Sequence, residues 1–266
     1  MTEPRDDLAA VVLAAGFGTR LRPLTDLRPK ALCPVGNVAL VDLAIARVAP
    51  HAADVAVNVH AHAALMHAHL ASPAALAANL GRALHVSDEQ PVPLGSGGAL
   101  GHLHDWIAGR PVLVTNVDAY LEDDLAALVE GWDGERPRLL VRTGGVPADF
   151  GPHHYVGACV VPAADAAALP DAFAGLHREV WWPEWTAGRL EVVEARGAAI
   201  DCGTPSDYLR ANLHASGGVS VVGVGAVVRG ELERAVVWPG GVVAEGERLV
   251  EAIRVGADLT VAAPQS

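Results

Sequence analysis

Residues 8–32, LAAVVLAAGFGTRLRPLTDLRPKAL, join an apolar run to a glycine-rich turn and a proline-punctuated loop. The run up to Gly16 is continuously apolar, which predicts a strand of a parallel sheet that is buried on both faces. Gly16 and Gly18 lack a Cβ, so the backbone of this turn can approach a phosphate closely and direct several N–H groups toward it. Arg20 can hold phosphate oxygens in a bidentate manner, and Lys30 adds a compact point charge. This stretch therefore predicts a triphosphate-binding turn after a buried strand.

The chain that follows alternates short apolar strands with helices. We expect strands over residues 55–59, 84–87 and 111–116, and helices over 40–48, 61–70, 99–107 and 122–130. This alternation is typical of an α/β fold with a mostly parallel sheet and helices on both faces. In such sheets ligands bind at the carboxyl ends of the strands, where the glycine-rich turn and Asn116-Val-Asp118 both fall. The acidic run 122–124 falls in the first turn of its predicted helix, where it suits the positive end of the helix.

The net charge limits the classes of partner. The chain has 266 residues, 51% of them apolar, and 19 basic against 31 acidic residues give a net charge of −12. So negative a chain is not expected to bind nucleic acid or an anionic membrane, and any polyanion site must be built locally. Lys30, the single lysine of the chain, falls inside the predicted phosphate-binding turn. The acidic start and the apolar run of only about ten residues match neither a signal peptide nor a membrane helix, so we expect a cytoplasmic protein.

The residue pattern of the chain changes after residue 217. Residues 219–228 and 235–243 are short β-branched runs separated by glycine, without helical patterning. Closely spaced runs of this kind predict a few coils of a β-helix, which we expect to be left-handed and which would be too short to be stable alone. We therefore predict one domain over 1–215 and a β-helical tail over 216–266. Two roles stay open for the tail, covering a sheet edge or pairing with a second subunit in a homodimer.

Four motifs, in order, resemble those of the sugar-phosphate nucleotidylyltransferases, or sugar-nucleotide pyrophosphorylases. Residues 13–32 are similar to the signature L-A-A-G-x-G-T-R-L-x-P-L-T-x-x-x-P-K-A-L, and 93–100, PLGSGGAL, to the nucleobase loop P-L-G-T-A-G-A-L. Asn116-Val-Asp118 resembles a metal motif (N/G)-x-D, and 201–209, DCGTPSDYL, a run D-x-G-T-P-x-D-Y-L. The resemblance covers most of residues 8–213 and is greatest to the mannose-1-phosphate guanylyltransferase-type branch. It implies a Rossmann-like, GT-A-like sheet.

The resemblance also implies a reaction, in which a sugar-1-phosphate attacks the α-phosphorus of a nucleoside triphosphate and releases pyrophosphate. Such a transfer needs in-line positioning and neutralisation of charge more than acid–base chemistry. Asp118 and Asp201 are implied as ligands of one Mg²⁺, and Arg20, Lys30 and Asp118 as catalytic residues. The residues implied in nucleotide binding are Ala14, Ala15, Gly16, Gly18, Thr19, Arg20, Lys30, Gln90, Gly95, Ser96 and Gly97.

The base and the sugar are less well defined by the sequence. The loop 95–98 slightly favours GTP, whereas Gln90 is similar to a glutamine that reads a pyrimidine in thymidylyl members of the family. For the sugar, the resemblance implies Asn116, Gly151 and Gly157. The chain departs from the family here, because the usual E-K-P run is missing and only residues 152–154 separate the two flanking motifs. Arg142, His153 and His154 are the candidates for the missing positive charge.

Three alternatives to a guanylyltransferase stay open. One is a uridylyl- or thymidylyltransferase that acts on another hexose-1-phosphate. Another is a non-catalytic nucleotide-sugar-binding regulatory protein of the same fold, which the lost E-K-P run favours and the presence of Arg20, Lys30, Asp118 and Asp201 disfavours. The third is a glycosyltransferase, which has a similar sheet but no need of the phosphate-binding turn.

Overall fold

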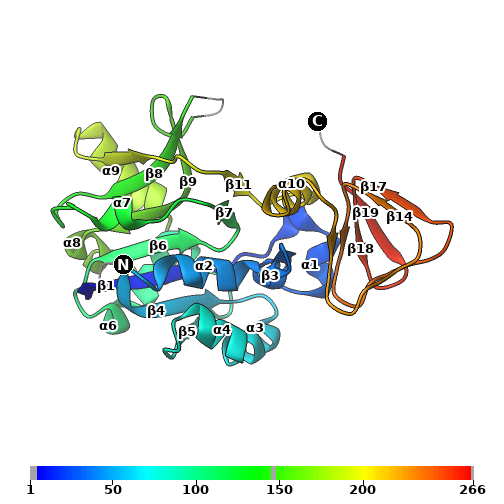
Figure 1. Ribbon diagram of the computed structural model, residues 1–266. Helices are drawn as coiled ribbons and strands as arrows, with labels where there is room; N and C mark the ends of the chain where they lie inside the picture. The colour runs from blue at the N-terminus through cyan, green and yellow to red at the C-terminus, as the bar shows by residue number, and fades with distance from the viewer. Residues whose placement is uncertain (1–4, 145–147, 265–266) are drawn as a thin grey trace. The chain divides into compact units, whose positions relative to one another are not determined.

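The computed structural model describes residues 5–144 and 148–264 (Figure 1). The chain forms two compact units. The first consists of the chain up to Phe17 and of Val41–Ala199, and the second of Gly18–Leu40 and the chain from Ile200 onward. None of the helices in the described ranges combines the length and the apolar character needed to cross a bilayer.

A seven-stranded sheet organises the first unit, with the strand order β10-β8-β9-β6-β1-β4-β5. Strand β9 is antiparallel to both of its neighbours, and the other pairs are parallel, so the sheet is mostly parallel as predicted. The strands are β1 (Arg5–Leu13), β4 (Ala52–Val59), β5 (His85–Asp88), β6 (Val112–Asn116), β8 (Arg138–Thr143), β9 (His153–Val161) and β10 (Glu191–Glu194), with the short β7 (Ala119–Leu121) outside this sheet.

The centre of this sheet is covered on both faces. Every side chain from Leu8 to Val12 in β1 is fully buried. Because successive residues of a strand point to opposite faces, both faces of β1 must be packed against other elements, which confirms the strand predicted from the apolar run. The helices of this unit are α2 (Leu40–Val48), α3 (Ala63–Leu70), α4 (Pro73–Ala78), α5 (Gly95–His102), α6 (His104–Ile107), α7 (Ala126–Val129), α8 (Ala163–Ala167) and α9 (Trp182–Thr186), with a π-helical turn His177–Trp181 before α9.

Two predicted helices differ from the structure. The helix expected over 99–107 is two helices, α5 and α6, and it begins at Gly95, within the loop assigned to the nucleobase. The helix expected over 122–130 is reduced to α7. Asp124 still accepts the first N–H of that helix, from Ala126 at 3.0 Å, but the interpretation of Glu122 and Asp123 was wrong. Carboxylate oxygens of Glu122 and Asp123 accept hydrogen bonds from the backbone N–H groups of residues 196–198, at 2.8–2.9 Å. Backbone N–H groups from a distant part of the chain therefore bind Glu122 and Asp123, which lie outside α7.

The second unit begins with tight turns and a small hairpin. The 3₁₀ turns Thr19–Leu21 and Lys30–Leu32 flank α1 (Leu24–Leu27), and β2 (Pro34–Val35) pairs with β3 (Val38–Ala39). Helix α10 (Pro205–Ala215) starts at the N-cap Thr204, whose hydroxyl accepts the N–H of Asp207 at 3.2 Å, with Pro205 in its first turn. This arrangement gives the TPSD part of the fourth motif a local role in starting a helix.

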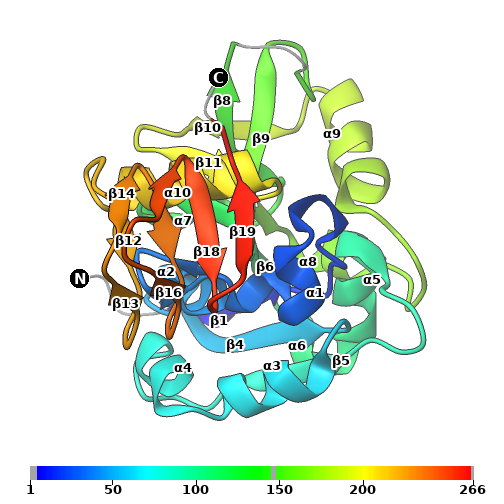
Figure 2. The same ribbon diagram turned by 90° about the vertical axis from the view of Figure 1, so that its right-hand side faces the viewer.

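The C-terminal strands are short, and most of them pair in parallel with another short strand further along the chain. Val221 pairs with Val236, Val227 with Val242, and Glu231 with Arg248, in three separate small sheets. Strand β19 then turns back antiparallel to β18, and the two lie side by side in Figure 2. Short parallel strands were expected here, whereas the left-handed β-helix and the domain boundary at residue 215 stay predictions. The strands are β12 (Val221–Val222), β13 (Val227–Val228), β14 (Glu231–Glu233), β15 (Val236–Val237), β16 (Val242–Val243), β17 (Arg248–Val250), β18 (Ala252–Val255) and β19 (Leu259–Ala262), preceded by β11 (Ala199–Asp201).

Candidate active site

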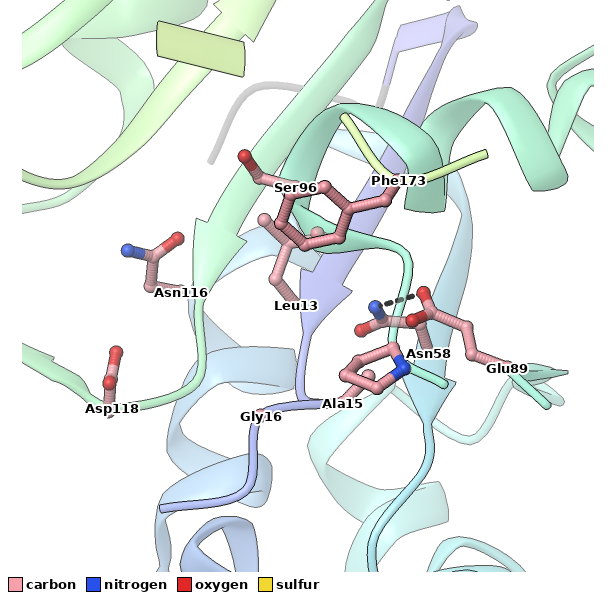
Figure 3. Close-up of a pocket in the computed structure, with 11 residues that line it drawn as sticks. Leu13, Ala15, Gly16, Asn58, Glu89, Ser96, Asn116, Asp118 and Phe173 are labelled. Atoms are coloured by element: carbon pink, nitrogen blue, oxygen red, sulfur yellow. Dashed lines mark hydrogen bonds between the residues drawn. The ribbon is translucent and has the colours of Figure 1, made fainter. Parts of the chain in front are cut away.

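A cavity of about 340 Å³ lies at the carboxyl ends of the parallel strands of the first unit. This is the edge at which open α/β sheets bind ligands. Figure 3 shows Asn116 and Asp118 on one side of the cavity and Asn58 with Glu89 on the other. The lining residues come from the ends of β1, β4, β5 and β6 and from two loops: Leu13, Ala15, Gly16, Asn58, Glu89, Pro93, Gly95, Ser96, Asn116, Asp118 and Phe173.

Gly16 leaves room for a ligand at the end of β1. A Cβ placed on Gly16 would meet no atom of the described residues within 4 Å. The backbone just before it is fixed, because the N–H of Ala14 donates to Oδ1 of Asn58 at 2.6 Å. The carbonyl of Leu13 in turn accepts the N–H of Val117 at 3.1 Å. The turn is therefore held from both neighbouring strands, while its outer side stays open toward the cavity.

A buried carboxylate that the sequence analysis missed belongs to the cavity wall. Glu89 is 1% exposed, and its Oε1 accepts Nδ2 of Asn58 at 2.7 Å while its Oε2 accepts the N–H of Leu94 at 2.6 Å. Gln90, the residue predicted to read the base, is exposed and is not among the described residues that line the cavity. The one signal in the sequence for this role of Glu89 was its position directly after a predicted strand and before a proline-rich loop.

The glycines of the loop 95–98 are explained by close packing as well as by the cavity. A Cβ on Gly95 would lie 2.5 Å from the carbonyl oxygen of Ala174, and one on Gly97 would lie 3.3 Å from it. The N–H of Gly97 donates to that same oxygen at 2.9 Å. The hydroxyl of Ser96 accepts the N–H of Leu176 at 3.0 Å. Gly95 and Ser96, which were predicted to bind the nucleotide, line the cavity. Gly97, which was predicted together with them, is buried against the 170–176 segment.

Of the residues predicted to contact the sugar, Asn116 lines the cavity. Gly157 lies behind it, in β9, with φ +108°, and a Cβ there would come within 2.4 Å of the Cβ of Ala119. Gly151 lies at the β8–β9 turn, where a Cβ would be 3.1 Å from Trp185. Neither glycine is among the described residues that line the cavity. The close contacts that a Cβ would make give both positions a packing reason to be glycine.

Tyr155 follows the same β8–β9 turn and lies near Asp118. Burial is the main cause that raises the pKa of the Tyr155 phenol well above its usual range, and the neighbouring Cys159 and the Asp118 carboxylate raise it further. A phenol with so high a pKa stays neutral at physiological pH. Tyr155 therefore adds no negative charge beside Asp118.

In the second unit the rest of the predicted phosphate-binding turn is sterically defined. Gly18 has φ +63°, and a Cβ there would lie 2.9 Å from Cγ2 of Thr25 and 3.1 Å from Cβ of Lys30. The Thr25 hydroxyl donates to the carbonyl of Gly18 at 2.9 Å, and the carbonyl of Thr19 accepts the N–H of Arg22 at 3.3 Å. Only glycine combines this backbone conformation with so close an approach.

Two cations converge on the carboxylate of Asp201 within this second unit. Nη2 of Arg20 lies 3.2 Å from Oδ2 of Asp201, and Nζ of Lys30 lies 3.8 Å from Oδ1. The Lys30 side chain is 10% exposed, against 65% for Arg20. A Cβ on Gly203 would meet the Arg20 guanidinium at 2.7 Å, so the glycine of the DCGTP run makes room for that cation. The structure thus brings together Arg20, Lys30 and Asp201, which the sequence predicted as site residues.

The predicted metal ligands have chemistry suited to a hard divalent cation. In residues 5–144 and 148–264, no cluster of three or more His, Cys, Asp or Glu side chains could hold a metal by itself. Magnesium, however, is commonly bound by one or two carboxylates together with substrate phosphates and water. Asp118 at the cavity and Asp201 beside two cations are both carboxylates of this kind. The donor set therefore fits a metal that arrives with a phosphate ligand.

Comparisons with known proteins agree with this geometry. The family model described as "Nucleotidyl transferase" matches residues 9–149. The chain is 35% identical over 190 residues to the N-acetylmuramate alpha-1-phosphate uridylyltransferase of Caulobacter vibrioides, a match that covers 67% of this chain and 76% of that protein. It is 31% identical over 146 residues to the mannose-1-phosphate guanylyltransferase of Mycobacterium tuberculosis, covering 53% of this chain and 39% of that protein.

Solved structures extend the likeness in fold. A Bacillus anthracis protein in complex with sucrose superposes with a TM-score of 0.68 at 20% identity, covering 78% of this chain and 95% of that chain. A UDP-glucose pyrophosphorylase complexed with UDP-glucose gives 0.62 at 14% identity, covering 79% and 99%. The fold is therefore the α/β nucleotidyltransferase fold. With its matching family model, relatives and site, the chain belongs to the nucleotidyl transferase family and is a nucleotidyltransferase of the sugar-phosphate type.

Proposed function

We propose that the chain transfers a nucleotidyl group from a nucleoside triphosphate to a sugar-1-phosphate and releases pyrophosphate. The observation that carries the proposal is the cavity at the carboxyl ends of β1 and β6, which is lined by both Gly16 and Asp118. An open backbone turn suits phosphate oxygens, and a carboxylate suits the cation that accompanies them. The two relatives are, by name, a uridylyltransferase and a guanylyltransferase of sugar phosphates, which supports a reaction of this type.

In this proposal each residue acts on charge or on position. The backbone at Gly16 binds phosphate oxygens, and Arg20 and Lys30 neutralise the negative charge that builds up on the leaving pyrophosphate. Asp118 and Asp201 are the proposed ligands of Mg²⁺, which when bound supplies electrostatic stabilisation of the phosphates. A phosphate oxygen of the sugar-1-phosphate forms the new P–O bond to the α-phosphorus while the bond to the β-phosphate oxygen breaks.

For the base we propose uracil ahead of guanine. The sequence preference for GTP rested on the glycines of the loop 95–98, and close packing against Ala174 accounts for those at positions 95 and 97. The relative that covers more of the chain is, by its name, a uridylyltransferase. Guanine stays the second candidate because the Glu89 carboxylate, at the cavity wall, is the kind of acceptor that the N1–H and N2–H donors of guanine require.

For the sugar we propose an acidic amino-sugar phosphate, because the same relative acts on N-acetylmuramate α-1-phosphate by its name. Three basic side chains at the β8–β9 turn are the candidates to meet its carboxylate or phosphate. Arg142 donates to the carbonyl of Gly197, His153 contacts Thr143 at 3.0 Å, and His154 lies 3.0 Å from Asp149. All three contacts are exposed to solvent, where a charged ligand can compete for the basic side chain.

We also propose that the tail after residue 215 is a short left-handed β-helix that joins two copies of the chain. The support is the parallel pairing of short strands across three small sheets and the valines that they leave exposed, among them Val222, Val227 and Val242. Sedimentation of the full chain and of a Val227→Glu, Val242→Glu variant tests the dimer. A monomer in both cases contradicts it.

The activity is tested by measuring pyrophosphate release with Mg²⁺, crossing UTP, GTP, dTTP, ATP and CTP with N-acetylmuramate, mannose and glucose 1-phosphates. Lys30→Ala tests the site, and Arg178→Ala is the matched control, because the Arg178 side chain is 89% exposed. Release that is lost in Lys30→Ala and kept in Arg178→Ala supports the proposal. Absence of release with every pair, while nucleotide sugars still bind tightly, would instead identify a regulatory protein of the same fold.

A further inference from the structure

An exposed aromatic ring lines the candidate active-site cavity. Phe173 is 80% exposed, although it belongs to a unit with a well-packed apolar core. Leaving a phenyl ring in water forgoes the favourable free energy of burying it, so an exposed ring at the wall of a cavity suggests a ligand that covers it. In Figure 3 the ring lies beside Ser96, between the Asn116–Asp118 side of the cavity and the Glu89 side.

The backbone that carries Phe173 is firmly held. The N–H of Ala174 donates to the carbonyl of Leu94 at 2.9 Å, and the carbonyl of Ala174 accepts the N–H groups of Gly97 and Gly98 at 2.9 and 3.2 Å. These bonds hold the residue directly after Phe173, so the backbone that carries the ring is anchored at that point. A residue that is both exposed and fixed loses little conformational entropy when a ligand binds against it.

Glycines in helix α5 make this close contact feasible. A Cβ on Gly98 would lie 2.1 Å from the carbonyl oxygen of Ala172, and one on Gly101 would lie 2.1 Å from that of Pro170. At Gly95 the Cβ would be 3.5 Å from the edge of the Phe173 ring itself. The glycine pattern thus places the 170–174 segment, and with it the phenyl ring, against the start of α5.

The surroundings of the ring suit a flat heterocycle. Leu13, Ala15 and Pro93 give the cavity apolar walls. Polar side chains also line it: Asn116 and Asp118 lie on one side and Asn58 with the buried Glu89 on the other, while Ser96 accepts the N–H of Leu176 and can donate its own proton. A nucleobase has apolar faces and a polar edge, which matches such a site, whereas a sugar presents hydroxyl groups on most sides.

We propose that Phe173 is the stacking platform for the nucleobase of the nucleotide substrate, with Ser96 donating to a carbonyl oxygen of the base. This inference rests on the proposed function for the identity of the ligand. Stacking of a base on an aromatic side chain typically changes affinity by roughly ten- to a hundredfold on alanine substitution. Phe173 is therefore a binding residue that the sequence motifs do not contain.

The test is equilibrium binding by titration calorimetry without Mg²⁺, so that no turnover occurs. The proteins are wild type, Phe173→Ala, Phe173→Trp and Leu65→Ala, an exposed apolar residue of α3 at 46% exposure that serves as the matched control. The ligands are UTP, GTP and inorganic tripolyphosphate, which has the phosphates but no base. We expect Phe173→Ala to bind the preferred nucleotide at least tenfold more weakly, with tripolyphosphate within twofold of wild type and Phe173→Trp close to wild type.

Three results would overturn the inference. They are unchanged nucleotide affinity in Phe173→Ala, an equal loss of affinity for tripolyphosphate, and absence of nucleotide binding to the wild type. A fourth such result is a rise in Phe173→Ala that is confined to the KM for the sugar-1-phosphate, which would assign the ring to the sugar. If the wild type shows the expected binding pattern but releases no pyrophosphate with any pair, the proposed function fails and the stacking residue stands.

Discussion

The bridge between Asn58 and Glu89 gives a stability prediction whose sign is set by hydrogen-bond polarity. Asn58 accepts from the N–H of Ala14 and donates to Glu89, and Glu89 accepts in addition from the N–H of Leu94. Glu89→Gln puts an NH₂ group where an acceptor is needed. A flip of the Asn58 amide does not repair this, because its NH₂ would then face the N–H of Ala14. One donor stays unpaired in either orientation.

The cost can be estimated because both side chains are buried, at 3% and 1% exposure. A buried donor without an acceptor costs about 1–3 kcal/mol. With about 2–4 °C of melting temperature per kcal/mol for a unit of this size, Glu89→Gln should lower Tm by about 2–12 °C. Asn58→Asp alone should cost at least as much, because it places two carboxylates at the 2.7 Å separation of the present hydrogen bond.

The double variant Asn58→Asp, Glu89→Gln is the decisive one. An aspartate at position 58 can accept from both Ala14 and the new glutamine amide, and the glutamine oxygen can accept from Leu94. Every donor is then paired and the net charge is unchanged. Thermal unfolding followed by circular dichroism should show the double variant within about 2 °C of wild type, which corresponds to a coupling of several kcal/mol. Additive losses in the double variant would refute the assigned polarity of the network.

Further predictions concern the two units separately. Lys30→Arg should lower kcat by about tenfold or more while leaving Tm close to wild type, because a guanidinium cannot take the compact ammonium's place in a 10% exposed pocket; steady-state kinetics and a melting curve test this. Gly98→Ala should lower Tm by several degrees, because its Cβ would meet a carbonyl oxygen at 2.1 Å, whereas Gly16→Ala, with open space around it, should keep Tm and weaken tripolyphosphate binding. Burial raises the pKa of the Cys33 and Cys159 thiols to about 12, so at pH 8 iodoacetamide should label them only after unfolding. Because a raised pKa means that the folded chain holds the proton more tightly, the stability that these thiols contribute should fall as the pH rises through the unfolded-state value; rapid labelling of the native chain would contradict the burial.

Local patterns predicted the parts of the structure that local forces decide. The apolar run of β1 and the helix α2, found at Leu40–Val48 as expected, follow from the burial of apolar side chains at strand and helix spacing. Gly18 and Lys30 lie close together because two 3₁₀ turns and α1 fold this short segment back on itself. A single sequence carries enough information for such elements, since the residues that stabilise them are close neighbours in the chain.

The features that were missed depend on partners far away in sequence. Glu122 and Asp123 have helix-like patterning, but their carboxylates bind backbone N–H groups some 70 residues later. Phe173 has no motif around it, and the residue after it, Ala174, is held by bonds to Leu94, Gly97 and Gly98. Glu89 is ordinary in the sequence until Asn58 from the neighbouring strand bonds to it. Such roles follow from tertiary contacts, which periodicity and spacing do not encode.

The Arg20–Asp201–Lys30 cluster shows how an acidic protein can build an anion site at low cost. The Arg20–Asp201 pair is largely exposed, so it stabilises the fold by at most about 1 kcal/mol. Breaking it when a phosphate takes Arg20 and a cation takes Asp201 therefore costs little. Lys30 is far more buried and lies 3.8 Å from the carboxylate, so it is held by its surroundings and keeps its position when the partner is lost. Arg20 and Lys30 both lie beside Asp201 in a chain whose net charge is −12, and we propose that these two cations attract the polyphosphate.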